Sequence, residues 1–146
     1  MKKAFVFVLL TSFLILSGCT APKDEVLKSI GDYKEKEFYS SSSFQSYMVY
    51  AKYTYEDVDF CDNKYFEIIT SDEKSNLLTH LENFENWIDV TEDDEISSGY
   101  DFASSIISDD DYLYIYDNPD YHELGYYDIY FFDKESFTLY FFHHDT

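Results

Sequence analysis

The apolar positions in the middle of the chain recur at the spacing of a helix. One stripe follows the order i, i+4, i+7 and i+11 and consists of Leu77, Leu81, Phe84 and Ile88. Ahead of the stripe, Thr70 and Glu73 match the S/T-x-x-E capping box, in which each side chain satisfies a free backbone donor of the first turn. The opposite side is polar, so the pattern predicts a surface helix that buries one side.

Alternation with a period of two predicts strands elsewhere. It starts in the stretch "FQSYMVYAKYTYEDV" and returns in "DYLYIYD", "YYDIYFFD" and "FTLYFFH". The last three stretches are separated by the turn-like segments "NPDYHELG" and "KES", which predicts an antiparallel meander. The stretch "YFEII" fits either a short strand or an irregular lead-in to the helix. We therefore expect an α+β domain in which one amphipathic helix packs on an antiparallel sheet of about four strands, in the order β-α-β-β-β.

Alternation divides the predicted meander into two faces. The face expected to pack on the helix holds Leu113, Ile115, Tyr127, Ile129, Phe131, Phe137, Leu139 and Phe141. The other face is rich in tyrosine and is the candidate binding face, with Tyr112, Tyr114, Tyr116, Tyr126, Asp128, Tyr130 and Tyr140 beside Phe132, Thr138 and Phe142.

Left open, the tyrosine-rich face would be a larger apolar patch than monomers usually expose. We expect the loop 91–110 and the neighbours of the first strand to cover it. The alternatives are a binding platform for peptides, sugars or cationic groups, which tyrosine rings suit, and self-association.

The first residues follow the pattern of an export signal. Lys2 and Lys3 precede a thirteen-residue apolar run from Ala4 to Leu16, which is shorter than the roughly 20 residues that a membrane-spanning helix needs. A basic start, a short apolar middle and small residues at the end are typical of a secretory signal peptide. We expect a signal peptide over residues 1–18, a flexible tether over 19–43 that ends in the serine run 40–43, and a single acidic domain over 44–146.

The end of the apolar run carries a more specific motif. Leu16, Ser17, Gly18 and Cys19 resemble the lipobox of bacterial lipoproteins. The resemblance covers residues 1–20 and implies cleavage before Cys19, palmitate-type acyl chains on its thiol, and attachment to the outer face of a bacterial membrane. The mature region is similar in composition to small lipoproteins of low-GC Gram-positive bacteria, and the alternative is an ordinary signal peptide with a chance cysteine. The pattern leaves open whether the envelope has one membrane or two.

The charge balance limits the partners. The chain has 30 acidic residues against 10 lysines and no arginine, with a formal net charge of −20. Such a chain offers no basic patch for a phosphate backbone, so nucleic-acid binding is not expected. The acids either solvate an exported surface or attract a cationic protein, peptide or glycan partner. We expect a monomer, and the acidic runs leave weak calcium binding open.

No constellation of side chains indicates catalysis, a metal site or a cofactor. His122 and Glu123 match half of the H-E-x-x-H zinc signature, but Tyr126 stands in place of the second histidine. The C-terminal His143, His144 and Asp145 are expected to lie on a frayed polar end. His80 is expected on the rim of the helix, and Cys61 as a buried small hydrophobe or a free thiol.

These observations favour a non-catalytic, membrane-anchored lipoprotein that binds another macromolecule or belongs to the envelope. One alternative is an inhibitor or immunity-type lipoprotein that neutralises a cationic protein or peptide by charge complementarity. The other alternative is a small envelope hydrolase that uses paired carboxylates, for which thirty acids always supply candidates.

Overall fold

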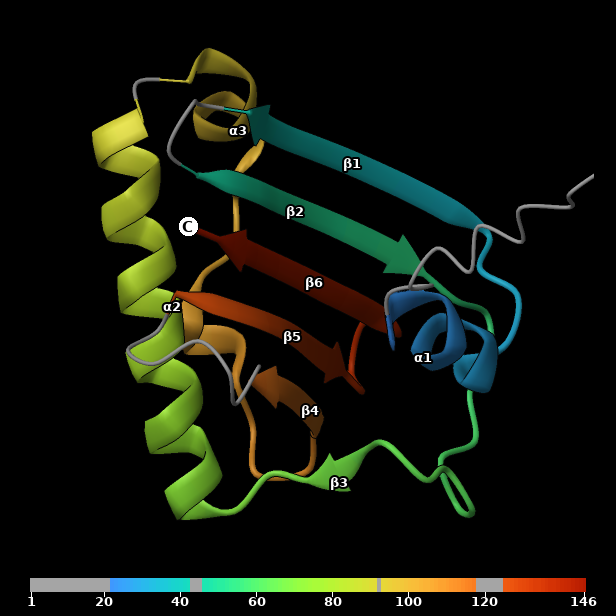
Figure 1. Ribbon diagram of the computed structural model, residues 1–146. Helices are drawn as coiled ribbons and strands as arrows, with labels where there is room; N and C mark the ends of the chain where they lie inside the picture. The colour runs from blue at the N-terminus through green and yellow to red at the C-terminus, as the bar shows by residue number, and fades with distance from the viewer. Residues whose placement is uncertain (1–21, 43–45, 92, 118–124) are drawn as a thin grey trace, which may run out of the picture.

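The computed structural model describes residues 22–42, 46–91, 93–117 and 125–146. The predicted signal peptide and the lipobox residues, Leu16, Ser17, Gly18 and Cys19, lie outside the described residues. Figure 1 shows a single sheet with helices on two sides of it. The helices are α1 (Pro22–Ile30), α2 (Ser71–Thr91), α3 (Asp94–Gly99) and a 3₁₀ turn η1 (Ser104–Ile106). The strands are β1 (Glu35–Ser42), β2 (Tyr47–Thr54), β3 (Glu67–Ile68), β4 (Tyr112–Asp117), β5 (Tyr126–Asp133) and β6 (Thr138–Asp145).

All neighbouring strands of the sheet are antiparallel, in the order β1-β2-β6-β5-β4-β3. The α+β class and the meander of β4, β5 and β6 are therefore confirmed. The number of elements is corrected, because the described residues form six strands and three α-helices instead of about four strands and one helix. The helices and strands that sequence reasoning missed are short or lie in polar segments, where periodicity is weak.

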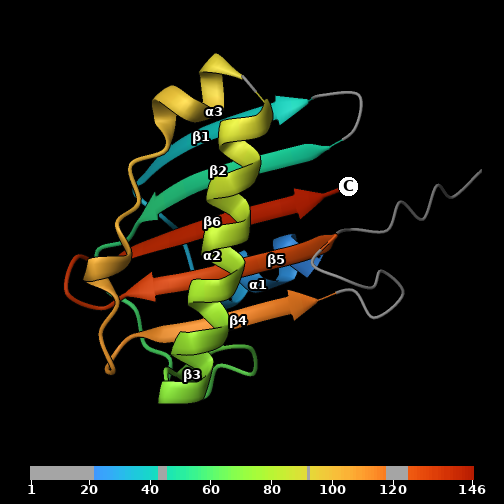
Figure 2. The ribbon, with the colours of Figure 1, turned by 90° about the vertical axis from the view of Figure 1, so that its left-hand side faces the viewer.

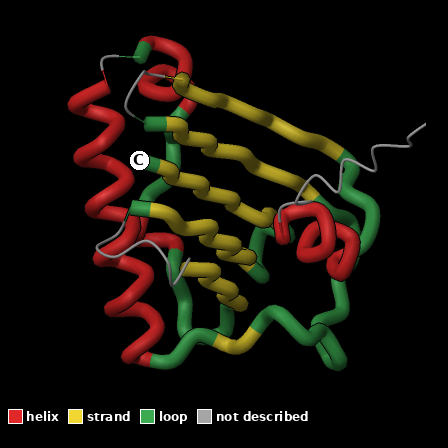
Figure 3. Tube along the Cα trace, in the orientation of Figure 1, coloured by secondary structure: helices red, strands yellow, loops and turns green. Residues whose placement is uncertain are grey.

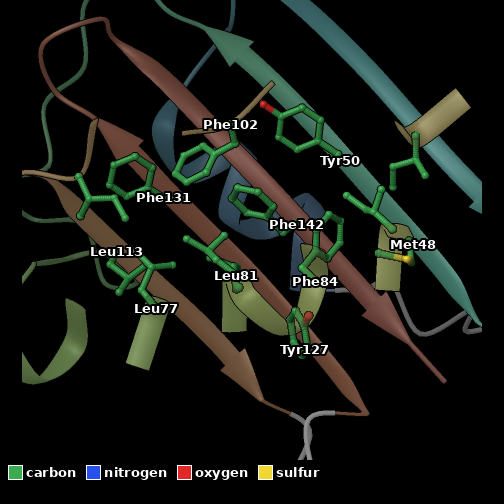
Figure 4. Packing of buried hydrophobic residues seen from close by; sticks show 14 of the residues in the cluster. Met48, Tyr50, Leu77, Leu81, Phe84, Phe102, Leu113, Tyr127, Phe131 and Phe142 are labelled. Carbon is green, nitrogen blue, oxygen red and sulfur yellow. The ribbon is translucent and has the colours of Figure 1, made fainter. Parts of the chain in front are cut away.

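The sheet separates two apolar layers. Figure 2 shows α2 running across the front of the sheet and α1 behind it, and Figure 3 shows the same layers by type of element. The layer on the α2 side contains the predicted stripe of Leu77, Leu81, Phe84 and Ile88. Figure 4 shows Leu77, Leu81 and Phe84 of this stripe beside Phe131 and Phe142 of the sheet. The second layer lies between the sheet, α1 and residues 55–66.

Helix α2 begins as its sequence predicts. The backbone N–H of Thr70 donates to the Glu73 carboxylate at 2.7 Å, and the N–H of Glu73 lies 3.4 Å from the Thr70 hydroxyl oxygen. This reciprocal pair is the capping box, which satisfies two backbone donors that have no partner inside the helix.

The predicted faces are right for β4 and β5 and wrong for β6. Phe131 pairs with Tyr140, and Ile129 pairs with Phe142, so Tyr140 and Phe142 lie on the α2 side. Leu139 and Phe141, expected on that side, lie in the second layer. Phe137, also assigned to the α2 face, lies in the turn with a φ of 52°. Alternation sorts the residues within one strand, but the turn between strands decides which set shares a face with the next strand.

The predicted tether is also corrected, because residues 22–42 belong to the fold. Val26 of α1 is fully buried and Ile30 is nearly so. Strand β1 pairs with β2 along all eight of its residues. The serine run that suggested flexibility is part of this strand, since Ser40 and Ser41 pair with Val49 and Met48. Composition favoured a linker, but pairing with an aromatic neighbouring strand determines the structure here.

Candidate functional site

Most of the predicted tyrosine-rich binding face is covered. Tyr130 is fully buried, Tyr112 stacks on Phe60 with ring centroids 4.4 Å apart, and Tyr114 contacts Tyr65 at 5.3 Å. The cover consists of α1 and residues 55–66. The loop 91–110, which was expected to provide it, packs on the α2 side through Phe102 and Ile107 instead. The favoured expectation of a covered face therefore holds, but through different segments.

One end of this face keeps a cluster of polar aromatic residues. We name Tyr47, Tyr116, Tyr126, Asp128 and His143 the tyrosine–histidine cluster. The His143 ring lies edge-on between Tyr47 and Tyr126, with centroid distances of 5.4 and 5.5 Å. Tyr126 also contacts Tyr116 at 6.4 Å. Tyr47 is 44% exposed, so the cluster reaches the surface.

The hydrogen bond between His143 and Asp128 fixes this cluster. His143 Nδ1 donates to the Asp128 carboxylate at 2.7 Å, and Asp128 is only 2% exposed. The cluster therefore sets the imidazole ring of His143 between two tyrosine rings, one of which is exposed.

Sequence reasoning assigned His143, His144 and Asp145 to a frayed end, and the structure corrects this. Strand β6 extends to Asp145, and His144 is fully buried between Trp87 and Tyr127. The sequence could have indicated this longer strand, because the stretch "FTLYFFH" runs on into His144 and Asp145 without a turn residue such as glycine or proline. Two adjacent histidines at a terminus suggested a polar end, whereas the His144 ring packs between two aromatic rings.

A second surface feature is a group of acids on the second half of α2 and on α3. We call it the α2–α3 acidic surface, and its exposed residues are Glu82, Glu85, Asp89, Asp94 and Glu95. No ion pair between described residues involves them. The sequence has no lysine or arginine between Lys74 and Lys134, so no basic side chain from that stretch compensates them. The last turn of α2 has no basic residue, and the negative end of the helix dipole adds to the same potential.

Short contacts hold α3 against the edge of the sheet. The Asp93 carboxylate accepts from the N–H of Glu95 at 2.9 Å and caps the helix. Gly99 lies directly against the ring of Tyr39, where a Cβ atom would overlap three ring carbons. The Tyr100 hydroxyl donates to Glu85 at 2.8 Å, and burial, followed by this hydrogen bond, raises the pKa of Tyr100 above its usual value. The position of the acidic surface is thus set by packing against β1 and α2.

The segment that follows α3 is attached to the sheet by a charged network. Asp101 accepts hydrogen bonds from the Tyr50 hydroxyl and the Lys52 ammonium, both at 2.7 Å. Lys52 also pairs with Glu37 at 2.9 Å. Burial favours a raised pKa for Asp101, but the two hydrogen bonds outweigh it and hold the pKa below its usual value.

The remaining candidates have structural roles or no assigned role. Both ring nitrogens of His80 face oxygen atoms, the Asn76 carbonyl at 2.9 Å and the Asp117 carboxylate at 3.0 Å. The expected rim residue is therefore buried and bridges α2 to β4. Cys61 is an exposed free thiol, which corrects the expectation of a buried side chain. The half zinc signature at His122 lies outside the described residues.

Within the described ranges, no group of three or more histidine, cysteine or acidic side chains is placed to hold a metal ion. In the same part of the chain, none of the helices has the length and apolar character needed to cross a bilayer. Comparison of the chain with protein-family models, curated proteins and solved structures found no match in any of the three.

Proposed function

We propose that this chain is a lipoprotein held at the outer face of a bacterial membrane through Cys19, and that its domain binds a cationic protein or peptide without catalysis. The observation that supports this proposal is the α2–α3 acidic surface, where five exposed carboxylates have no basic partner among the described residues. Carboxylates without basic partners attract a partner of the opposite sign.

The strength of this attraction depends on salt. A lysine ammonium 4 Å from one carboxylate gains about 1 kcal/mol in bulk water and about 4 kcal/mol at the effective dielectric constant of a protein surface. At physiological ionic strength the Debye length is about 8 Å, so charges beyond the nearest acids contribute little. Several adjacent carboxylates are therefore needed, and α2 and α3 bring them together. Binding should be fast and should weaken steeply with added salt.

The proposed anchor suits this arrangement. Because α1 begins at Pro22, only three residue steps separate Cys19 from the fold, which span at most about 11 Å. A lipidated Cys19 would thus hold α1 near the bilayer. Helix α2, which carries three acids of this surface, lies on the opposite face of the sheet from α1 (Figure 2). An acidic surface there avoids anionic headgroups and remains open to a partner outside the cell.

A narrower version is an inhibitor or immunity-type lipoprotein, in which binding also blocks the activity of a basic toxin, peptide or hydrolase. It uses the same acidic surface and differs only in the consequence for the partner. An activity assay of the captured partner, with and without this protein, separates the two versions.

The test of the binding surface uses two variants with the same change of charge. E82Q/D89N/D94N neutralises three acids of the α2–α3 acidic surface, and E35Q/D57N/D62N neutralises three exposed acids elsewhere. We expect the dissociation constant of fluorescent decalysine, measured by anisotropy at low salt, to rise at least fivefold more in the first variant. Equal losses in both would show that only the net charge matters and would refute this surface.

The anchor has its own test. Cells that express the full chain and are fed an alkyne analogue of palmitate should label the wild-type protein but not C19A. The wild-type protein should partition into the detergent phase, and C19A should not. Labelling that persists in C19A would refute the lipidation site.

A further inference from the structure

The two edges of the sheet differ in how they are protected. Strand β1 forms one edge and begins with the alternating charges of Glu35, Lys36 and Glu37, a pattern that discourages pairing with another strand. Farther along, the backbone N–H of Ser40 donates to the Glu95 side chain of α3 at 3.3 Å. Helix α3 also packs on Tyr39. The β1 edge is thus blocked along much of its length.

The opposite edge is covered only in part. Strand β3 pairs with just two residues of β4, Tyr112 and Leu113. Strand β4 continues to Asp117 and consists of tyrosine, leucine and isoleucine before that aspartate. This edge has no alternating charge like that of β1. Of the described residues in β4, those from Tyr114 onward have no strand beside them on the β3 side.

The hydrogen-bond pattern tells which backbone groups face outward there. The N–H of Ile69 donates to the carbonyl of Asp111 at 3.0 Å, so Asp111 directs its backbone groups toward β3. Backbone direction alternates along a strand, so Leu113, Ile115 and Asp117 point the same way. Leu113 lies opposite Glu67 of β3. In the part of the chain that the structure describes, no strand pairs with Ile115 and Asp117 on this side, so their N–H and C=O groups face an open edge.

A groove of about 350 Å³ lies beside this open edge. Tyr114 and Ile115 form one side of it, and α2 contributes Glu73 and Asn76. Glu67 of β3 also lines the groove. The lining also includes Lys64, whose ammonium lies 4.6 Å from the centre of the Tyr65 ring. The groove therefore has two carboxylates, one ammonium, one amide and aromatic side chains, next to backbone groups of β4 that no described strand pairs with.

We propose that an extended segment of a cationic partner adds to β4 as a further strand, pairs with the backbone of Ile115 and Asp117, and places a lysine or arginine side chain in this groove beside Glu67 and Glu73. Strand addition is a general mode of peptide recognition, in which backbone hydrogen bonds give affinity and side-chain pockets give specificity. The charge of the partner rests on the proposed function, whereas the place and mode of docking rest on the edge itself.

The choice of a peptide follows from the chemistry of the edge. A main chain supplies donors and acceptors at the spacing that Ile115 and Asp117 require. Side chains of an added strand alternate between the two faces, so every second residue would lie toward α2 and the groove. A long basic side chain fits there, because its stem can contact Ile115 on the α2 side of the sheet while its charged end reaches the carboxylates.

The test uses the intact protein from Cys19 onward, labelled with ¹⁵N, and the peptide acetyl-Lys-Val-Lys-Val-Lys-Val-Lys-amide. We expect the amide protons of Ile115 and Asp117 to exchange at least tenfold more slowly when the peptide is bound. The amides of Lys36 and Phe38 on the β1 edge serve as internal controls and should not change. An absence of added protection at Ile115 and Asp117, or equal protection on the β1 edge, would overturn the proposal.

A second peptide, with proline in place of each valine, keeps the charge but cannot pair as a strand. It should bind at least tenfold more weakly, and equal binding would overturn strand addition. E67Q should lower the affinity for the valine peptide two- to fivefold, while D62N, an exposed acid outside the groove, should not. If binding is lost in E82Q/D89N/D94N and Ile115 is never protected, the proposed function stands and the docking mode falls.

Discussion

The contact between Gly99 and Tyr39 allows a sharp prediction for Gly99→Ala. Gly99 is the last residue of α3, and a Cβ built on it would overlap Cγ, Cδ1 and Cε1 of the Tyr39 ring. The ring is not free to move away, because it stacks on Tyr50 with centroids 6.2 Å apart and donates its hydroxyl to Glu37 at 3.1 Å. Accommodating a methyl group therefore requires α3 to shift from the sheet or the Tyr39 ring to leave its rotamer.

Two effects of opposite sign determine how much Gly99→Ala changes the free energy of unfolding. Alanine is better than glycine inside a helix by up to about 1 kcal/mol, an advantage that shrinks at the last residue of a six-residue helix. Overpacking a filled contact costs about 1–3 kcal/mol. We therefore expect Gly99→Ala to lower the free energy of unfolding by about 1–2 kcal/mol. Since α3 carries Asp94 and Glu95, the variant should also weaken decalysine binding.

The assay is urea unfolding of Gly99→Ala, Tyr39→Ala and the double variant, combined as a double-mutant cycle. Removing the ring removes the overlap, so Gly99→Ala should be neutral or slightly stabilising in the Tyr39→Ala background. Gly31→Ala is the control, because Gly31 has a φ of 115° and no atom within 4 Å of its Cβ position. Its loss of stability arises from backbone strain and should be the same in both backgrounds. Additive effects of Gly99→Ala and Tyr39→Ala would refute the overlap argument.

Three further predictions concern the core and its polar contacts. Asp101→Asn should lower stability by about 1 kcal/mol at neutral pH, since it weakens the hydrogen bonds from Tyr50 and Lys52. Because folding lowers the pKa of Asp101, this difference should be full above about pH 5 and vanish as the pH falls through the folded pKa, as urea titrations at several pH values would show. Tyr127→Phe removes the hydroxyl that donates to oxygen atoms of α2 at 3.1 and 3.3 Å, and should cost about 0.5–1.5 kcal/mol in urea unfolding. Phe142→Ala, at a fully buried ring in the α2 layer, should cost about 3–5 kcal/mol in the same assay.

The elements that sequence reasoning predicted well are those whose own residues determine them. Helix α2 has a capping box, a continuous stripe and a polar opposite side, and all three are local signals. The strands of the meander have strong alternation and turn-like connections. Their pairing as β4-β5-β6 follows because short connections join antiparallel neighbours.

The errors arise where contacts between residues far apart in the sequence determine the structure. The assignment of Leu139 and Tyr140 to the wrong faces came from the turn at Phe137, whose positive φ is invisible to alternation. The cover of the tyrosine-rich face comes from α1 and residues 55–66, which have little periodicity of their own. The tyrosine–histidine cluster shows the same limit. Tyr116, Tyr126 and Asp128 were assigned to one face, but Tyr47 and His143 join them only through the pairing of β2 and β5 with β6.

Because residues 22–42 belong to the fold, a final prediction distinguishes a structural element from a tether. A chain that begins at residue 44 lacks α1 and β1, and a chain that begins at residue 22 keeps both. The first loses eight residues of strand pairing along β2 and the burial of Val26 and Ile30, each worth about 1.5–3 kcal/mol. Small domains have only about 5–15 kcal/mol of net stability, so the shorter chain should show no cooperative thermal unfolding by circular dichroism. Val26→Ala in the longer chain should cost about 2 kcal/mol, because it leaves a cavity under α1. A shorter chain that unfolds cooperatively with nearly the stability of the longer one would show that the segment is a tether after all.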